Sequence, residues 1–194
     1  RVDKLIFYRA LLKALKDGIN VIYDATNITR KSRLSILKQL PAYVEKKCII
    51  TWAPIDECIG RDACRERTVG VEVINKMLQR FEAPFYDEGF DDIEIYFSGY
   101  QPGSSYYDEH MKNLEIPHNN PHHTVDVAEH CRLCGEGLAS LELPWVVKTA
   151  GFVHDIGKPY TKTFVNTKGE TTDVAHYYGH QGVGAWISYG FMYT

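Results

Sequence analysis

The chain has 194 residues, of which 44% are hydrophobic, and this composition is ordinary for one or two globular domains. Its 22 Lys and Arg against 25 Asp and Glu give a net charge of -3. The chain therefore lacks the overall positive charge that would bind a long polyanion such as nucleic acid along its length. No apolar run is long enough to span a membrane, and the five cysteines form an odd set, so we expect a reduced, cytoplasmic protein.

The first residues, Arg1–Gly18, have the apolar spacing of an amphipathic helix and lack the apolar core of a signal peptide. Because the chain starts with Arg1, we expect it to begin inside a larger protein. The sequence then predicts alternating strands and helices as far as about Phe97, listed as a strand 19–23, a helix 30–40, a strand 47–52, helices 56–67 and 71–81, and a strand 92–97. This alternation predicts an α/β domain with a parallel sheet.

Residues 98–119 are rich in Gly, Pro, Ser, Tyr and His and have no periodicity, which predicts a linker. From residue 120 to 194 the pattern is helical only, with helices expected at 124–138, 144–156 and 174–189 and a polar loop at 158–172. The expected organisation is therefore an N-terminal α/β domain (1–97), a linker, and a helical domain (120–194).

All eight histidines lie between His110 and His180, so the two halves are expected to do different chemistry. The doublet His154–Asp155 ends an apolar stretch, where burying a polar pair is costly unless something compensates it. A divalent cation would do so, because imidazole and carboxylate suit zinc, iron or manganese and, less well, magnesium. His123 and His130 are seven residues apart and are expected on one helical face.

Val127-Ala128-Glu129-His130 followed by Phe152-Val153-His154-Asp155-Ile156-Gly157-Lys158 resembles the signature of the HD superfamily of metal-dependent phosphohydrolases. The resemblance implies that His130, His154 and Asp155 are metal ligands, with His176 and His180 matching an extension that accompanies a second metal. Manganese, nickel, cobalt, iron, zinc or magnesium would fit, one ion or two. The family's final Asp is missing, since no acidic residue follows His180.

Each of these residues has a plainer alternative. His176 and His180 would look the same as a surface pair on one helix, and His123 is equally compatible with a substrate contact or a cap. Lys158 is a candidate for neutralising substrate phosphate, or a cation stabilising a helix C-terminus. His110 and His118 are interpreted as linker residues, and Cys131 and Cys134 as packing residues, because a structural zinc site would need a second pair.

In the N-terminal half, the strand that ends at Asp24-Ala25-Thr26-Asn27 would place polar groups where open α/β sheets bind ligands. An arginine-rich helix follows, on which Arg61 and Arg65 are expected to form one cationic face with Arg67 alongside. The plainer alternative is a solvated helical face. These segments resemble P-loop kinases of the polynucleotide-kinase type, with Arg30 and Arg33 on the intervening helix. The resemblance implies that Arg61, Arg65 and Arg67 contact the transferring phosphate and that Asp24 lies near the metal or acceptor.

The chain contains no Gly-x-x-x-x-Gly-Lys-Ser/Thr, so Mg²⁺–ATP is expected as a cofactor only if a P-loop lies upstream. The leading hypothesis is a kinase–HD fusion that resembles bifunctional enzymes healing nucleic-acid ends, with a metal-dependent phosphohydrolase in the HD half. The alternatives are a nucleotide phosphohydrolase with a vestigial kinase half, and a non-catalytic module binding metal or RNA. The expected partners are nucleic-acid ends or nucleotides, with no membrane; the sequence leaves the oligomeric state open.

Overall fold

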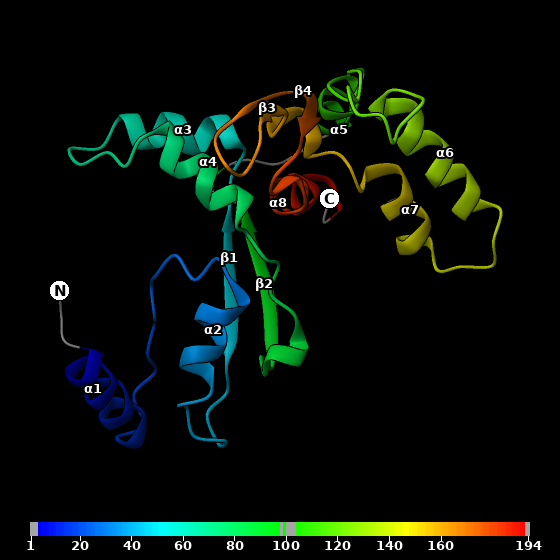
Figure 1. Ribbon diagram of the computed structural model, residues 1–194. Helices are drawn as coiled ribbons and strands as arrows, with labels where there is room; N and C mark the ends of the chain where they lie inside the picture. The colour runs from blue at the N-terminus through cyan, green and yellow to red at the C-terminus, as the bar shows by residue number, and fades with distance from the viewer. Residues whose placement is uncertain (1–3, 98, 100–103, 193–194) are drawn as a thin grey trace. The chain divides into compact units, whose positions relative to one another are not determined.

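The computed structural model describes residues 4–97, 99 and 104–192, and it divides into two compact units (Figure 1). Unit 1 consists of Arg1–Ile50 and Pro84–Glu94, and unit 2 of Thr51–Ala83 and Ile95–Thr194. This division differs from the predicted N-terminal and C-terminal domains, because residues 51–83 belong to the same unit as the histidine-rich part of the chain.

Unit 1 is built on a small parallel sheet. Its elements are α1 (Lys4–Lys16), α2 (Arg30–Leu37) and the 3₁₀ helix η1 (Tyr86–Glu88), with the first residues of the strands β1 (Lys47–Trp52) and β2 (Asp92–Phe97). The strand residues from Thr51 and from Ile95 on belong to unit 2. The two strands pair and run in the same direction (Figure 1). Helix α2 begins where the Thr29 side chain accepts a hydrogen bond from the Ser32 amide, which satisfies one of the free N–H groups of the first turn. The expected α/β class is confirmed.

A buried ion pair joins α2 to η1 inside unit 1. Arg33 donates from Nε and Nη2 to the two carboxylate oxygens of Glu88, both at 2.8 Å, and Glu88 also accepts the amide of Phe85. Burial alone would raise the pKa of Glu88, but the Arg33 and Phe85 hydrogen bonds outweigh it and lower that pKa. The neighbouring pair of Arg30 and Asp87 spans the same two elements at the surface.

The expected strand at 19–23 is absent from the described residues of unit 1. This segment has no regular structure, and Ile22 is 94% exposed. The sheet consists of β1 and β2, and neither pairs with it. An apolar run becomes a strand only where a neighbouring strand supplies backbone partners, and the amino-acid pattern cannot report whether one is present.

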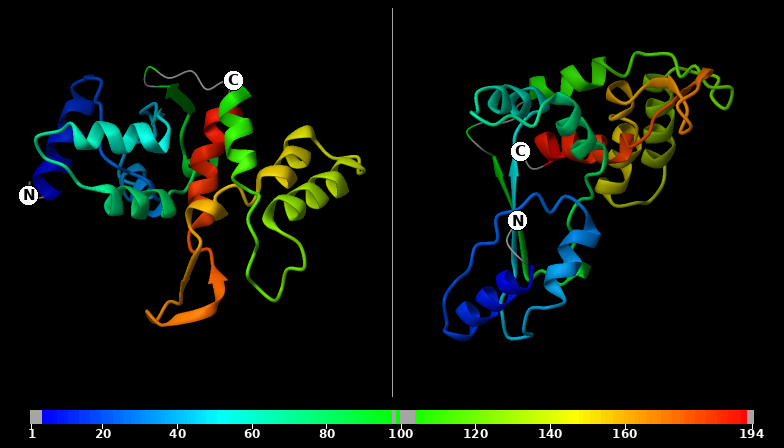
Figure 2. Two further views of the ribbon diagram at one scale, coloured as in Figure 1. Left: turned by 90° about the horizontal axis from the view of Figure 1, so that it is seen from above. Right: turned by 60° about the vertical axis from the view of Figure 1, so that its left-hand side comes forward.

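Unit 2 is a mainly helical assembly with a main apolar core and a smaller apolar cluster of Leu114, Val127 and Cys131. Its helices are α3 (Ile55–Ala63), α4 (Val71–Gln79), α5 (Ser104–Lys112), α6 (Val127–Ala139), α7 (Trp145–Val153), η2 (Lys158–Tyr160) and α8 (His180–Met192). Helix α8 packs against α4, α5 and η2, and α6 lies beside α7 (Figure 2). The core contains Trp52, Leu78, Tyr106, Ile156 and Ile187.

The segment expected to be a linker contains α5 instead. Tyr106 is 6% exposed and Leu114 is fully buried, and two histidines assigned to the linker, His110 and His118, are buried as well. The prediction of a linker is therefore wrong for residues 104–119, while residues 98 and 100–103 lie outside the described part of the chain. The polar composition hid a short helix whose apolar side is mostly aromatic.

The expectation of helices alone after residue 120 also needs correction. Strands β3 (Thr163–Val165) and β4 (Thr171–His176) form an antiparallel hairpin in which Thr163 faces His176. The Gly169 backbone, at φ 84°, takes the left-handed conformation that the turn needs. Helix α8 consequently begins at His180 and not near Val174. Several β-branched residues at 163–174 favour strand structure, and this preference is not visible in the helical spacing of apolar residues.

Among the described residues, no helix has the length and apolarity required to cross a membrane.

Candidate metal centre and adjoining pocket

Two glycines let α6 and α7 come close enough to bring their histidines together. A Cβ added at Gly135 would lie 2.3 Å from the Phe152 ring, and one at Gly151 would lie 3.0 Å from the Cα of Gly135. Helix α6 begins at its N-cap, Asp126, whose side chain accepts the Glu129 amide at 2.7 Å. His130 in the first turn of α6 therefore faces His154 at the C-terminal end of α7.

Three imidazole nitrogens surround the buried carboxylate of Asp155. Its Oδ2 lies 3.3 Å from Nε2 of His154 and 3.6 Å from Nε2 of His130, and its Oδ1 lies 3.4 Å from Nε2 of His180. The Nε2 atoms of His130 and His154 are 3.1 Å apart. The structure thus brings together three of the histidines expected from the sequence, on α6, α7 and α8, with the expected Asp.

The donor set fits a divalent cation. Imidazole ligands at about 2.0–2.1 Å from one ion lie roughly 3.0–3.4 Å from each other, which is close to the separations found here. Nδ1 of His154 donates to the Gly151 carbonyl and Nδ1 of His180 to the Tyr177 carbonyl, at 2.9 and 2.8 Å. Because Nδ1 carries the proton, each Nε2 is left with a lone pair for a cation, as in known metal sites.

Electrostatics keep the carboxylate anionic. Burial alone would raise the pKa of Asp155, but hydrogen bonds from His154, when that ring is protonated, and from Lys158 outweigh this and hold that pKa well below its usual range. The same contact with Asp155 raises the pKa of His154 against the effect of burial. Burial lowers the pKa of His130, so this imidazole is neutral and available as a ligand near pH 7.

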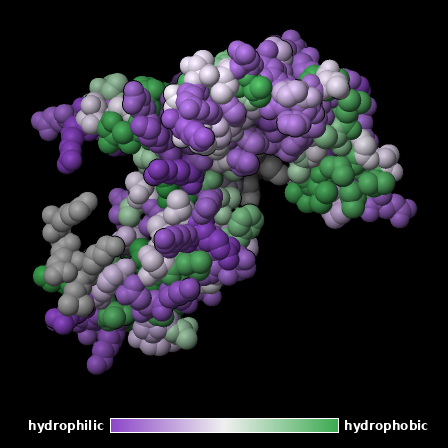
Figure 3. Space-filling model, viewed as in Figure 1, coloured by the Kyte–Doolittle hydropathy of each residue, from purple (hydrophilic) through white to green (hydrophobic). Residues whose placement is uncertain are grey.

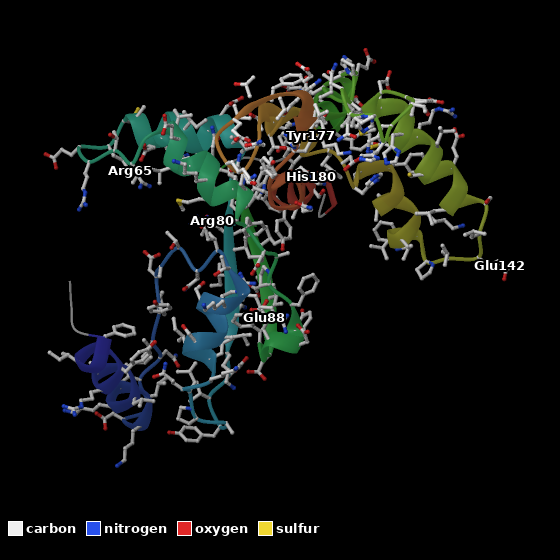
Figure 4. The ribbon with its side chains drawn as sticks, viewed as in Figure 1. Arg65, Arg80, Glu88, Glu142, Tyr177 and His180 are labelled. Carbon is white, nitrogen blue, oxygen red and sulfur yellow. The ribbon has the colours of Figure 1, made fainter. Side chains whose placement is uncertain are left out.

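A pocket of about 340 Å³, open to solvent, is lined in part by Lys158 and His180, both of which contact this carboxylate. Lys158 lines it with residues of β4 and of the start of α8, and Tyr177 and His180 lie near each other in this region (Figure 4). Nζ of Lys158 is 2.7 Å from Oδ2 of Asp155 and 5.2 Å from the centre of the Tyr177 ring. A cationic group therefore stands between the candidate metal centre and the pocket.

Two histidines that the sequence did not assign to this site belong beside it. Nδ1 of His118 donates to the Val125 carbonyl, which leaves its Nε2 to accept Nζ of Lys158 at 3.2 Å. The His123 ring stacks on His118 at 3.8 Å and lies 5.1 Å from the His130 ring. His123 precedes α6, so the expectation that it shares a helical face with His130 is wrong, although the two rings meet. The cluster of histidines at 118–123 was the available signal for this arrangement.

His176 is placed differently from the other expected ligands. It lies on β4 and not on a helix with His180, and its Nε2 is 3.1 Å from Oγ1 of Thr172. The expected shared helical face of these two histidines is therefore wrong. His176 lines the pocket, and its ring stacks with Tyr178 at 5.3 Å, so the structure puts it beside the centre as a wall residue.

The candidate residues of the kinase-like half are exposed. Arg61 pairs with Glu57 at 2.6 Å on α3, while Arg65 and Arg67 lie beyond the end of that helix, where Arg65 is remote from Tyr177 and His180 (Figure 4). The expected helical face shared by Arg61 and Arg65 is therefore not formed. The helix ends early because buried Asp62 accepts the amides of Val69 and Gly70 and folds the chain back. Asp24 is exposed in unit 1, within the segment where no strand forms.

Comparison with known families agrees with this layout. Residues 122–191 match the family described as HD domain, and residues 5–84 match the family described as AAA domain. Residues 122–191 are therefore similar to HD domains, a class of metal-dependent phosphohydrolases, and residues 5–84 to the P-loop kinase-like AAA domain. The organisation inferred from the sequence motifs, a kinase-like half followed by an HD half, is confirmed.

One similar curated protein is transcription factor bHLH140 of Arabidopsis thaliana, with 30% identity over 92 residues. The match covers 44% of this chain and 10% of that protein, so the chain spans only a small part of its relative's length. No solved structure matches.

Proposed function

We propose that the HD domain of this chain is a metal-dependent phosphohydrolase that removes phosphate, terminal or cyclic, from nucleic-acid ends or nucleotides. The observation that carries the proposal is the convergence of the Nε2 atoms of His130, His154 and His180 on the single buried carboxylate of Asp155. These four residues would hold the cation. A divalent ion bound there supplies a Lewis acid for a phosphoryl oxygen and makes water more acidic.

The protein groups around this centre are suited to a phosphate ester. The Lys158 ammonium faces both the carboxylate and the pocket, so it can neutralise phosphate charge where the reaction takes place. His118 fixes the position of that ammonium from the other side. Burial lowers the pKa of both His118 and His123, which keeps these imidazoles neutral near pH 7 and avoids additional positive charge beside Lys158.

The pocket supports a nucleotide-sized substrate. Its volume of about 340 Å³ is at the small end of ligand pockets, which suits one sugar with its phosphate better than a long polymer segment. Tyr177, Tyr178 and His176 supply aromatic surface on which a base or sugar can lie. The overall charge of -3 also favours recognition of an end over binding along a strand.

The kinase-like half extends the proposal to a bifunctional end-healing enzyme. In such an enzyme Arg61, Arg65 and Arg67 would contact the transferring phosphate, Asp24 would lie near the acceptor, and Mg²⁺–ATP would be required. Residues 1–194 hold no P-loop motif, so phosphorylation of a 5′ hydroxyl is proposed only for a polypeptide in which a P-loop accompanies these residues.

The decisive experiment compares substrates for the wild type and His154→Ala in manganese, nickel or cobalt. An RNA with a 2′,3′-cyclic phosphate end, an RNA with a 3′-phosphate, and free nucleotides are offered separately, and release of phosphate or ring opening is followed. Turnover of an RNA end by the wild type alone supports end healing, and turnover of free nucleotides alone supports the nucleotide phosphohydrolase. Metal binding without turnover of any substrate would contradict the phosphohydrolase proposal and favour the non-catalytic module. The observation that supports this alternative is the 2.7 Å pairing of Asp155 with Lys158.

A further inference from the structure

Cys134 lies on the same face of α6 as His130, one helical turn further on. Its Sγ is 3.8 Å from Nε2 of His130, and the side chain is partly accessible. Cys131 is fully buried, where it packs with Leu114 and Val127 in an apolar cluster, although its Sγ also lies within 4.8 Å of ligand atoms of His154 and Asp155. Apolar surroundings disfavour its thiolate. The two cysteines of this helix therefore occupy different environments, and only one of them packs as the sequence suggested for both.

The position of Cys134 matches a ligand position. Its Sγ and the Nε2 atoms of His130 and His154 all lie within 4.8 Å of one another. In a tetrahedral site with a metal–sulfur distance of about 2.3 Å and a metal–nitrogen distance of about 2.05 Å, sulfur and nitrogen are roughly 3.6 Å apart. The distance of 3.8 Å between Sγ of Cys134 and Nε2 of His130 requires a sulfur–metal–nitrogen angle only slightly wider than tetrahedral.

Charge gives an independent reason for a further anionic ligand. In the ligand groups found among the described residues, Asp155 is the sole carboxylate, and one of its oxygens is paired with the Lys158 ammonium at 2.7 Å. A divalent ion held by neutral imidazoles and this carboxylate would therefore keep a net positive charge. A thiolate adds the missing negative charge at a point within reach of both His130 and His154.

We infer that the Cys134 thiolate is a further metal ligand of this centre, in addition to His130, His154, Asp155 and His180. On binding, the Cys134 thiol loses its proton to solvent and a sulfur–metal bond forms. A thiolate is a soft ligand, so the centre should select zinc, cobalt or iron over magnesium. This inference rests on the proposed metal-dependent function, because it assigns one more ligand to the same centre.

The test uses Co²⁺ as the probe and optical absorption as the readout, independent of catalysis. A cobalt–thiolate bond gives an intense near-ultraviolet charge-transfer band, whereas cobalt bound by nitrogen and oxygen alone gives only weak visible bands. We expect the wild type to show the charge-transfer band at one equivalent of cobalt. Cys134→Ser should lose the band, while Cys131→Ser and Cys64→Ser, the latter an exposed cysteine on the loop after α3, should retain it.

The outcomes separate failure of this inference from failure of the proposed function. The wild type could bind cobalt without showing the charge-transfer band, while His154→Ala loses cobalt binding. This result would support the metal centre and overturn the role of Cys134. Loss of the band in Cys131→Ser with retention in Cys134→Ser would overturn it as well. Absence of any bound cobalt in the wild type, measured by equilibrium dialysis, would refute the metal centre and hence both proposals. Circular dichroism of each variant checks that it is folded.

Discussion

The ammonium of Lys158 and the carboxylate of Asp155 form a buried ion pair, with Nζ 2.7 Å from Oδ2 and exposed side-chain fractions of 8% and 5%. The two residues are three positions apart in the His-Asp-Ile-Gly-Lys segment, at the junction of α7 and η2. A helix-terminal cation would be exposed and would contact main-chain carbonyls, so this geometry does not fit the helix-stabilising alternative for Lys158. The lysine ammonium pairs with the same carboxylate oxygen, Oδ2, that lies near Nε2 of His130 and His154.

Lys158→Met should destabilise the metal-free protein by about 3 kcal/mol, because it leaves a buried carboxylate without its cation. Zinc or manganese should then stabilise the variant more than the wild type, since the ion now provides the missing positive charge. Thermal unfolding with and without metal measures both effects. Lys168→Met, at the exposed turn of the β3–β4 hairpin, is the control and should change neither. Equal metal-induced stabilisation in wild type and Lys158→Met would contradict this account.

His180→Ala and His176→Ala form a matched pair. His180 has its Nε2 3.4 Å from Asp155, whereas Nε2 of His176 is directed to Thr172. His180→Ala should weaken metal binding by about 10-fold or more, as expected when a ligand or its support is removed. His176→Ala should leave metal affinity nearly unchanged and raise KM for a nucleotide substrate, because His176 lines the pocket. Isothermal titration with Mn²⁺ decides the first point, and equal losses of affinity would show that both histidines are ligands.

Gly157→Ala should destabilise unit 2 by about 3 kcal/mol. A Cβ at this position would lie 2.0 Å from the carbonyl oxygen of His180 and 2.6 Å from the amide nitrogen of Gly184, so α8 must move away. Because α8 carries His180, metal affinity should fall together with stability. Gly137→Ala is the control: this glycine is exposed on α6 with nothing near its Cβ position, and the change should stabilise by roughly 0.5–1 kcal/mol. Urea unfolding measures both, and an unchanged Gly157→Ala protein would refute the close packing.

Glu88→Gln should lower the stability of unit 1 by about 3 kcal/mol near neutral pH, because it leaves Arg33 buried opposite a neutral amide. The pKa of Glu88 in the folded protein lies below its ordinary value of 4.5, so the pair contributes fully above that pH. Its contribution is lost as the pH falls through the lowered pKa. The stability difference between wild type and variant should therefore shrink on acidification from pH about 7 to about 3.

The control for this pH experiment is Asp87→Asn, which removes the exposed partner of Arg30 and should change stability little. A difference between wild type and Glu88→Gln that stays constant with pH would contradict the ion-pair explanation and point to altered packing.

Local patterns in the sequence were sufficient for most of the helices. The predicted helices beginning at Arg30 and Val71 and the strands at 47–52 and 92–97 appear as α2, α4, β1 and β2. These elements are specified by caps, apolar spacing and β-branched runs, which act within a few residues. The expected strand at 19–23 failed because a strand depends on a partner elsewhere in the chain.

For the candidate site, the sequence alone predicted the chemistry. A doublet at the end of an apolar helix calls for a compensating cation, and the resemblance to the HD signature implied His130, His154, Asp155, His176 and His180 as its ligands. Only the tertiary structure decided how they are used. It placed His176 in the pocket wall, buried Lys158 against Asp155, brought His118 and His123 into the cluster, and turned Cys134 toward His130 while Cys131 faces the core. Each of these outcomes depends on how helices and a hairpin distant in the chain pack together, and residue spacing along one segment carries no information about that.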